Sequence, residues 1–322
     1  MSAVDDLICC PRCHGPLRLT PSMAICTTSD CPDLVEGFPR LADGQLVLID
    51  FERSIFPRDN YAVARSVSVL NRDVRTSGPL FWLRELALTV DTRISPANAH
   101  AMLDELRRLS DHPRLLVVGG GALGHGLDII VADGSVEVVT VDVYASPNTD
   151  LLADGHRLPF RDAVFDGVWI QAVLEHVLEP HTVVGEIYRV LRPMGTVYAE
   201  TPFMCAVHEG AYDFTRFSAS GHRWLFRHFV QIGAGTLGGA GTTLVWAIRY
   251  FWRAFGIGEK AAIALTLPFF WVRYLDRFTN DRKSADAGYA FWFFGRKDPG
   301  VETPAYAMPA YYQAFCGSSA SR

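Results

Sequence analysis

The 322-residue sequence lacks any apolar run long enough to cross a membrane as a helix, although 49% of its residues are hydrophobic. The longest candidates, residues 244–256 and 261–275, stop short of the roughly 18–20 uninterrupted apolar residues that a spanning helix needs. The first ten residues contain two acidic side chains and no apolar core of the kind found in signal peptides. We therefore expect a cytoplasmic protein.

An excess of positive charge is also missing, because the formal net charge is −5. Without an overall basic field to attract a polyanion, we expect no nucleic-acid partner. No internal repeat or low-complexity segment is present. The length and the 20% of charged residues are typical of one large globular domain with a small appendage.

Cysteine is scarce outside the first 31 residues, where five of the seven cysteines lie. This clustering fits metal binding in a reducing compartment better than a secreted disulfide framework. Four of them form a C-x2-C and a C-x4-C pair, namely Cys10, Cys13, Cys26 and Cys31. Two such pairs can complete a tetrahedral thiolate site for structural zinc, with Cys9 and His14 as substitute ligands. The alternative is that the four reduced cysteines pack as small hydrophobic side chains.

The cysteine segment continues into a Gly37-Phe38-Pro39 turn. With this turn it resembles the zinc-ribbon domain of a tRNA-methyltransferase activator family. The resemblance implies one structural zinc ion with all four coordination positions taken by protein, and hence no chemistry at the metal. We predict a zinc-ribbon domain over residues 1–50.

A glycine-rich turn follows the first strongly apolar run of the chain, residues 115–118. A short apolar run bounded by glycine is typical of a buried strand in a parallel sheet. Gly119, Gly121 and Gly124 then have the G-x-G-x-x-G spacing, which lets a ligand approach the backbone. The next apolar run ends in Asp142, where a carboxylate can accept both hydroxyls of a ribose. The pattern favours a nucleotide-like cofactor, with an ordinary strand–helix turn as the alternative.

A characteristic series of residues follows the glycine loop: Asp154, LPF (158–160), FDGVWIQ (165–171) and VLEH (173–176). Together with YRVLRPMGTVYAETP (188–202), this series resembles the class I S-adenosylmethionine-dependent methyltransferases, in the small-molecule branch close to the ubiquinone-biosynthesis type. The resemblance covers roughly residues 113–203.

The resemblance implies an α/β fold with a doubly wound seven-stranded Rossmann-like sheet and S-adenosylmethionine as cofactor. In this family the glycine loop passes under the methionine part of the cofactor. The acid of the second strand, here Asp142, holds the ribose, and the acid of the third strand, here Asp154, faces the adenine amino group. A nicotinamide-dependent dehydrogenase is the rival interpretation, but it would not need the series after Asp142.

The sequence departs from the family at Val117, where an acid usually contacts the ammonium group of the methionine part. That group then needs another partner, such as backbone carbonyls or Gln171. A methyltransferase-like protein that binds without catalysis remains a third class of function for this reason.

Polar residues are dense among aromatic ones over residues 201–226, after the predicted fifth strand. The P-F…H…D-F-x-R-F-S pattern of this stretch resembles methyltransferases associated with glycan and lipid-linked glycan biosynthesis. We predict that His208 is the catalytic base, because an imidazole can take a proton near neutral pH. Glu175 and Asp213 are the next candidates, although Asp213 and Arg216, three residues apart, can instead pair to fix the loop. We interpret His176 as structural.

Residues 237–283 are apolar and aromatic, with arginines spaced through them. Over 240–283 we count seven Lys or Arg and three acids, a local net charge of +4. An apolar, cationic helical insertion suggests peripheral contact with the cytoplasmic face of a membrane. A lid or a homodimer interface is the alternative. Residues 288–297 are expected to form the last, antiparallel strand, and residues 299–322 a loose tail.

The segment 51–112 is expected to hold a linker and then helices over 80–90 and 96–109. The methyltransferase domain should span 113–298. The predicted reaction is O-methylation of a sugar hydroxyl on a glycan or lipid-linked glycan. The alternatives are another small-molecule acceptor, or an RNA or protein acceptor that the ribbon would dock.

Overall fold

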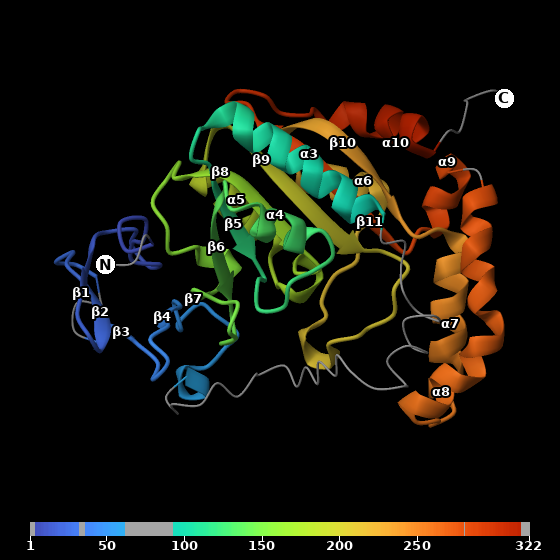
Figure 1. Cartoon of the computed structure of the whole chain (residues 1–322), viewed down its shortest axis with the longest axis horizontal. Helices are drawn as coiled ribbons and strands as arrows, with labels where there is room; N and C mark the ends of the chain where they lie inside the picture. The colour runs from blue at the N-terminus through green and yellow to red at the C-terminus, as the bar shows by residue number, and fades with distance from the viewer. Residues whose placement is uncertain (1–3, 32–35, 62–92, 280, 317–322) are drawn as a thin grey trace.

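The computed structural model describes residues 4–31, 36–61, 93–279 and 281–316. In this part of the chain an eight-stranded sheet carries helices on both faces, and a small three-stranded sheet lies at one end of the molecule (Figure 1). The predicted helix over 80–90 lies outside the described residues. The helix predicted at 96–109 is present as α3.

The large sheet has the order β10-β11-β9-β8-β5-β6-β7-β4. The strands in chain order are β1 (Leu17–Leu19), β2 (Met23–Cys26), β3 (Phe38–Pro39), β4 (Leu46–Leu48), β5 (Arg114–Val118), β6 (Glu137–Asp142), β7 (Leu151–Ala153), β8 (Phe165–Gln171), β9 (Leu191–Pro202), β10 (Phe229–Leu237) and β11 (Ala290–Lys297). The α-helices are α3 (Ile94–Leu109), α4 (Leu127–Asp133), α5 (Pro180–Val190), α6 (Ala219–Leu225), α7 (Ala240–Ala254), α8 (Glu259–Thr266), α9 (Asp281–Ser284) and α10 (Met308–Cys316). The 3-10 helices are η1 (Arg58–Tyr61), η2 (Gly155–Arg157), η3 (Leu174–His176), η4 (Gly210–Tyr212), η5 (Leu267–Phe278), η6 (Ala285–Ala287) and η7 (Ala305–Ala307).

Strand β5 shows why the apolar run before the glycine loop is continuous. Successive side chains of a strand point to opposite faces of the sheet. Leu115 and Val117 belong to the core on the α3 and α4 side, whereas Leu116 and Val118 belong to the core on the α5 side. Because both faces are covered, every position needs an apolar side chain, each contributing about 1.5–3 kcal/mol on full burial. Parallel pairing with β6 and β8 puts β5 inside the sheet.

The strand count differs from the prediction, since the sheet has eight strands and not seven. The additional strand is β4, which pairs in parallel with β7 through Leu46↔Leu151 and Leu48↔Ala153. All three residues of β4 are buried. No sequence pattern indicated this strand, because three apolar residues near the end of the predicted ribbon could equally belong to the ribbon itself.

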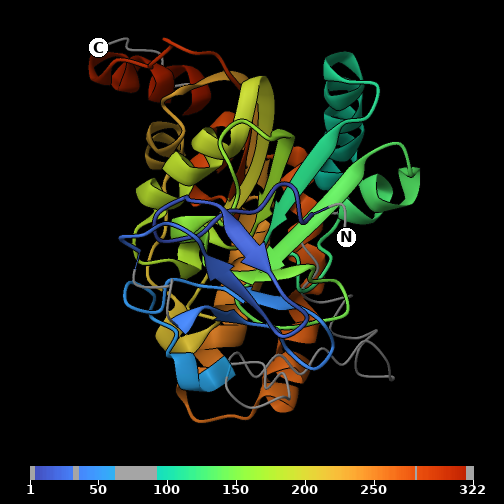
Figure 2. The same ribbon diagram turned by 90° about the vertical axis from the view of Figure 1, so that its left-hand side faces the viewer.

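The N-terminal segment packs on the large sheet. Ile8 forms an antiparallel bridge with Phe160, and the Cys9 amide donates to the Pro159 carbonyl at 2.9 Å. Figure 2 views the molecule from this side, with the blue strands β1 to β3 in front of the central sheet. The predicted boundary at residue 50 therefore separates segments that share one hydrophobic core.

The predicted helical insertion lies between β10 and β11 and consists mainly of α7, α8 and η5, at the end of the molecule opposite the N-terminal strands (Figure 1). Strand β11 is antiparallel to both β9 and β10, as predicted for the last strand. The segment predicted as a loose tail contains helix α10, whose Phe315 packs edge-on against Phe291. Among the described residues, no helix combines the length and apolar character needed to cross a membrane.

Candidate functional site

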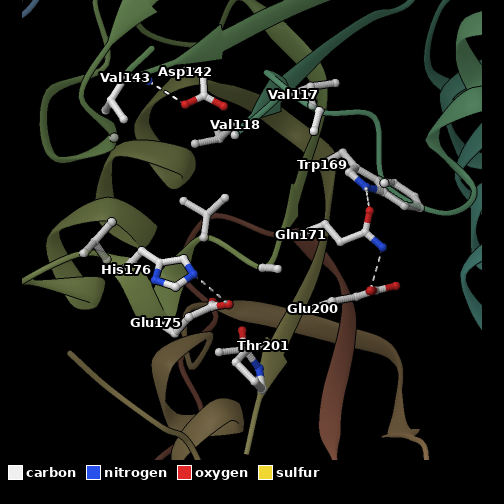
Figure 3. A pocket seen from close by; sticks show the side chains of 18 of the residues that line it. Val117, Val118, Asp142, Val143, Trp169, Gln171, Glu175, His176, Glu200 and Thr201 are labelled. Atoms are coloured by element: carbon white, nitrogen blue, oxygen red, sulfur yellow. Dashed lines mark hydrogen bonds and ion pairs between the residues drawn. The ribbon is translucent and has the colours of Figure 1, made fainter. Parts of the chain in front are cut away.

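One cavity of about 420 Å³ opens at the carboxyl ends of the parallel strands. Because ligands of doubly wound sheets bind at this edge, the cavity is the natural site for a cofactor. Its lining includes six of the seven sequence-predicted cofactor and catalytic residues, namely Gly119, Gly124, Asp142, Asp154, Gln171 and His208. Gly121, the seventh, lies in the same loop but does not line the cavity. Figure 3 shows part of this lining.

Glycines of the loop occupy positions that admit no side chain. Gly119 has a φ of +82°, and a β-carbon there would collide with Val173. A β-carbon at Gly124 would collide with the amide of Gln171. The loop thus brings its backbone close to the start of η3 and the end of β8, as the spacing of the glycines predicts.

Asp142 ends strand β6 and is buried, with 8% of its surface exposed. Its Oδ2 accepts a hydrogen bond from the Gly121 amide at 2.8 Å, and its Oδ1 accepts one from the Val143 amide at 2.7 Å (Figure 3). These bonds fix the carboxylate between the glycine loop and the strand end. A carboxylate oxygen has further lone pairs, so both oxygens can still accept from a ligand hydroxyl.

Asp154 follows β7 and is held by two side chains that the sequence analysis did not single out. Its Oδ2 accepts from Ser54 Oγ at 2.6 Å, and its Oδ1 lies 2.6 Å from His156 Nδ1 and 3.0 Å from the His156 amide. Burial opposes ionisation of Asp154, but the bonds from His156 and Ser54 outweigh it and hold the pKa of this carboxyl below its usual range. Asp154 is therefore ionised at neutral pH.

One part of the cavity contains an acid from a strand beyond β8, Glu200 of β9. Gln171 Nε2 donates to Glu200 Oε2 at 2.6 Å (Figure 3). Ser95 Oγ donates to Glu200 Oε1 at 2.7 Å, and the Tyr198 hydroxyl donates to the same oxygen at 2.6 Å. Glu200 was not predicted as a site residue, although its position at the end of a predicted strand was a usable signal.

The opposite part of the cavity contains a cluster that we call the Glu175 cluster, formed by Glu175, His176 and His208. His176 Nε2 lies 3.1 Å from His208 Nε2 and 3.4 Å from Glu175 Oε1, and His208 Nε2 lies 3.7 Å from the same oxygen. Figure 3 shows the Glu175 and His176 side chains directed toward each other. Burial lowers the pKa of both histidines, which favours their neutral forms.

The loop that carries His208 is fixed by the predicted Asp213–Arg216 pair. Arg216 Nη1 donates to Asp213 Oδ1 at 2.5 Å, and Nη2 donates to Oδ2 at 2.8 Å. Asp213 Oδ2 also accepts from the His208 amide at 3.0 Å. His176, interpreted as structural, does donate from Nδ1 to the Tyr212 carbonyl at 2.7 Å, but its other nitrogen joins the cluster.

The four predicted zinc ligands come together near the N-terminus. Their sulfur atoms all lie within 4.8 Å of one another, with Cys10 Sγ 3.7 Å from Cys31 Sγ and Cys13 Sγ 3.5 Å from Cys26 Sγ. Burial opposes ionisation of Cys13, but hydrogen bonds from the Gly15 amide and Thr28 lower its pKa to about 7. The substitute ligands Cys9 and His14 do not belong to this group.

Comparisons with known proteins agree with the cofactor end of the site. Residues 118–199 match a family described as a methyltransferase domain. A demethylmenaquinone methyltransferase of Symbiobacterium thermophilum is 32% identical over 34% of this chain and 42% of its own length. The corresponding enzyme of Streptomyces griseus is 30% identical over 42% of this chain and 55% of its own length. The chain thus spans about half the length of these curated relatives.

Solved structures also align with the chain. Phosphoethanolamine N-methyltransferase 2 of Haemonchus contortus, in complex with S-adenosyl-L-methionine, aligns with a TM-score of 0.45 and 16% identity, over 76% of this chain and 61% of that one. Geranyl diphosphate C-methyltransferase of Streptomyces coelicolor aligns with a TM-score of 0.40 and 13% identity, over 62% of this chain and 75% of that one. The family match and the glycine loop at the carboxyl edge of a doubly wound sheet both indicate a methyltransferase domain at residues 118–199.

Proposed function

We propose that the protein transfers a methyl group from S-adenosylmethionine to a small-molecule hydroxyl group bound beside the Glu175 cluster. The observation that carries this proposal is that one cavity joins the glycine loop, Asp142 and Asp154 to that cluster. In the reaction the bond from sulfur to the methyl carbon breaks, and sulfur keeps the electron pair. A bond from the acceptor oxygen to the methyl carbon forms, and the hydroxyl proton leaves on the side of the cluster. That His208 takes this proton stays a prediction.

For the cofactor we propose the family's arrangement, with the ribose hydroxyls on Asp142 and the adenine amino group toward Asp154. Glu200 is our candidate partner for the ammonium group, because it is a buried acid in the lining of the cavity, whereas position 117 carries an apolar valine. Ser95 and Gln171 donate to Glu200 and keep its carboxylate in place. A buried carboxylate with fixed donors is a good partner for a cation when the remaining lone pairs face it.

For the acceptor we favour a sugar hydroxyl of a glycan or lipid-linked glycan. A second cavity, lined by Val207, Trp246, Arg249 and Tyr250 among others, shares His208 and Tyr289 with the first. Aromatic and arginine side chains suit stacking on sugar rings and binding of phosphate groups. A demethylmenaquinone-like acceptor is the second candidate, because the curated relatives carry that name.

The experiment that tests the proposed function combines binding and turnover on the full chain. Calorimetry should detect one S-adenosylhomocysteine site per chain. Radiolabelled methyl transfer should then be measured on lipid-linked glycans and on demethylmenaquinone. Binding with labelled product on either acceptor class supports methyl transfer. Absence of cofactor binding would overturn the proposal, and binding without product on any acceptor would favour a non-catalytic role.

We propose that Cys10, Cys13, Cys26 and Cys31 bind one structural zinc ion. With zinc–sulfur bonds of about 2.3 Å, a tetrahedral site requires sulfur–sulfur distances of about 3.8 Å. The observed pairs at 3.5 and 3.7 Å are close to this value. Elemental analysis should show one zinc ion fewer in Cys26→Ser than in wild type, with Cys9→Ser as the matched control. Equal zinc contents would contradict the site.

We also propose peripheral membrane contact through the insertion. Its exposed apolar side chains include Phe255 and Phe278, which are 69% and 79% exposed, and Arg253, Arg273 and Arg277 add positive charge. Flotation with anionic vesicles at low salt should carry the protein, and salt should weaken this binding. Phe278→Ser should reduce flotation more than Tyr306→Ser, a comparably exposed control outside the insertion. Equal behaviour of the two variants would favour a lid or a dimer interface.

A further inference from the structure

The Glu175 cluster brings three potential metal-ligand atoms to one point. Glu175 and His176 belong to η3, directly after β8, and His208 belongs to the loop after β9. The triangle formed by His176 Nε2, His208 Nε2 and Glu175 Oε1 has edges of 3.1, 3.4 and 3.7 Å. Nothing in the methyltransferase resemblance assigns these three residues together.

The size of this triangle matches a first-row divalent ion. Such ions bind imidazole nitrogen and carboxylate oxygen at about 2.0–2.2 Å, so neighbouring ligands of a tetrahedral site lie about 3.3–3.6 Å apart. The edge of 3.4 Å lies within this range, and the edges of 3.1 and 3.7 Å lie just below and just above it. An ion bound equally to the three atoms would keep further coordination positions toward the cavity.

The outer nitrogens of both histidines have the partners that metal-bound histidines use. His176 Nδ1 donates to the Tyr212 carbonyl at 2.7 Å, which leaves the Nε2 lone pair directed into the cluster. His208 Nδ1 lies 3.4 Å from Asp213 Oδ2 and 3.4 Å from the Ala206 carbonyl, with Arg216 Nη2 at 3.5 Å. A hydrogen on Nδ1 directed at Asp213 gives His208 the carboxylate–histidine arrangement that orients metal ligands.

The charges are also suitable. The Glu175 side chain is fully buried, and its carboxyl group can supply one negative charge to a bound ion. Two neutral imidazoles and one carboxylate are a donor set that suits Zn²⁺, Fe²⁺ or Mn²⁺ when positions remain open for other ligands. The cysteine site near the N-terminus differs in this respect, because it has four thiolate ligands.

We infer that Glu175, His176 and His208 form a site for a divalent transition-metal ion, separate from the cysteine site, and that its open positions face the acceptor part of the cavity. The assignment of those positions to oxygen atoms of the acceptor rests on the proposed function. With an ion bound, His208 Nε2 is a ligand and not the proton acceptor. The ion would then hold the acceptor hydroxyl and lower its pKa, so that the hydroxyl proton could leave to solvent water without a protein base.

Zinc binding by the full chain tests the site directly. After loading with Zn²⁺ and removal of excess metal, wild type should contain one zinc ion more per chain than His176→Ala or His208→Ala. The comparison is a difference, so it holds whether or not the cysteine site is filled. His181→Ala, a change on the exposed side of α5 away from the cavity, is the matched control and should retain the wild-type content.

Asp213→Asn provides a second measurement that does not remove a ligand. Loss of such a supporting carboxylate typically weakens metal binding 10- to 100-fold. We expect a weaker Zn²⁺ affinity of this size in competition with a chelator, with unchanged stoichiometry and native circular dichroism. Equal zinc contents of wild type, His176→Ala and His208→Ala, all folded, would overturn the metal site.

The outcomes separate this inference from the proposed function. S-adenosylhomocysteine binding is measured on the same preparations and does not depend on the cluster. Zinc binding at the cluster without cofactor binding would support the site and contradict the methyltransferase proposal. Cofactor binding and methyl transfer with equal zinc contents in all variants would support the methyltransferase proposal and contradict the metal site.

Discussion

The two parts of the cavity are constructed differently. The cofactor part consists of backbone at Gly119 to Gly124 and of single carboxylates at strand ends, each already hydrogen-bonded to a neighbouring backbone amide or side chain. The acceptor part consists of side chains from two separate segments, since His176 and His208 lie 32 positions apart in the sequence. Each predicted residue of the first part was recognisable from a short stretch of sequence, whereas the arrangement of the second part depends on the path of the chain.

This difference predicts a separation of effects. Changes in the cofactor part should alter affinity for S-adenosylmethionine and its product, because we propose that those residues contact the nucleoside. Changes in the acceptor part should alter turnover and leave cofactor affinity near the wild-type value. The predictions below test this separation in order of expected size.

The largest effect is expected for His208→Ala. Removal of a positioned base typically costs about 100- to 10,000-fold in rate, and removal of a metal ligand that holds the acceptor should act in the same direction. Turnover should fall by this factor while calorimetric affinity for S-adenosylhomocysteine stays unchanged. His181→Ala is the control and should behave as wild type. A His208→Gln enzyme with near-wild-type turnover would show that the imidazole only packs.

A smaller effect, on affinity alone, is expected for Asp142→Ala. Loss of charge-assisted hydrogen bonds to the ribose should weaken cofactor binding by about 1.5–3 kcal/mol. Asp142→Asn is the matched variant, because its side-chain oxygen can still accept from the Gly121 amide. If calorimetry gave the same affinity for wild type and Asp142→Ala, the ribose would lie elsewhere.

The third prediction concerns stability, which must be separated from both site effects. His222 of α6 is buried, and its Nε2 forms a hydrogen bond with Thr201 Oγ1 at 3.1 Å; burial lowers the pKa of His222 to about 3. Unfolded histidine has a pKa near 6.5, so between about pH 6.5 and pH 3 the unfolded state binds a proton that the native state does not. Stability due to His222 should therefore fall by about 2 kcal/mol between pH 7 and pH 5.

Denaturant unfolding at pH 7 and pH 5 measures this contribution. His222→Phe should remove that part of the pH dependence, because phenylalanine does not titrate. A phenylalanine ring fits at this position because Phe226 and Phe293 already surround the His222 ring. The comparison uses the difference between the two pH values, so a change in absolute stability does not affect it. An identical pH dependence in wild type and variant would mean that His222 becomes protonated at the same pH in the folded protein as in the unfolded chain.

Much of the fold and of the cofactor part followed from sequence because its signals are local. The apolar strand before Gly119, the acid that ends β6 and the antiparallel β11 each depend on residues within one element. The four cysteines were likewise found from two short spacings, and the structure brings them together.

The remaining features depend on tertiary contacts that no local pattern reveals. Strand β4 became part of the large sheet only because its three residues meet β7 across about 100 positions of chain. Glu200 joins the cavity through its pairing with Gln171 in the next strand. The role of Glu175 required the loop with His208 to fold back over η3, and this path could not be read from either segment alone.

The central claim is that one cavity aligns the cofactor sulfur with the Glu175 cluster. A crystal structure of the protein with S-adenosylhomocysteine tests it most directly. The account predicts ribose hydroxyls within hydrogen-bond distance of Asp142 and the sulfur atom facing the cavity toward His176 and His208. A ligand whose sulfur faced away from this cluster, or a ligand bound outside the cavity, would contradict it.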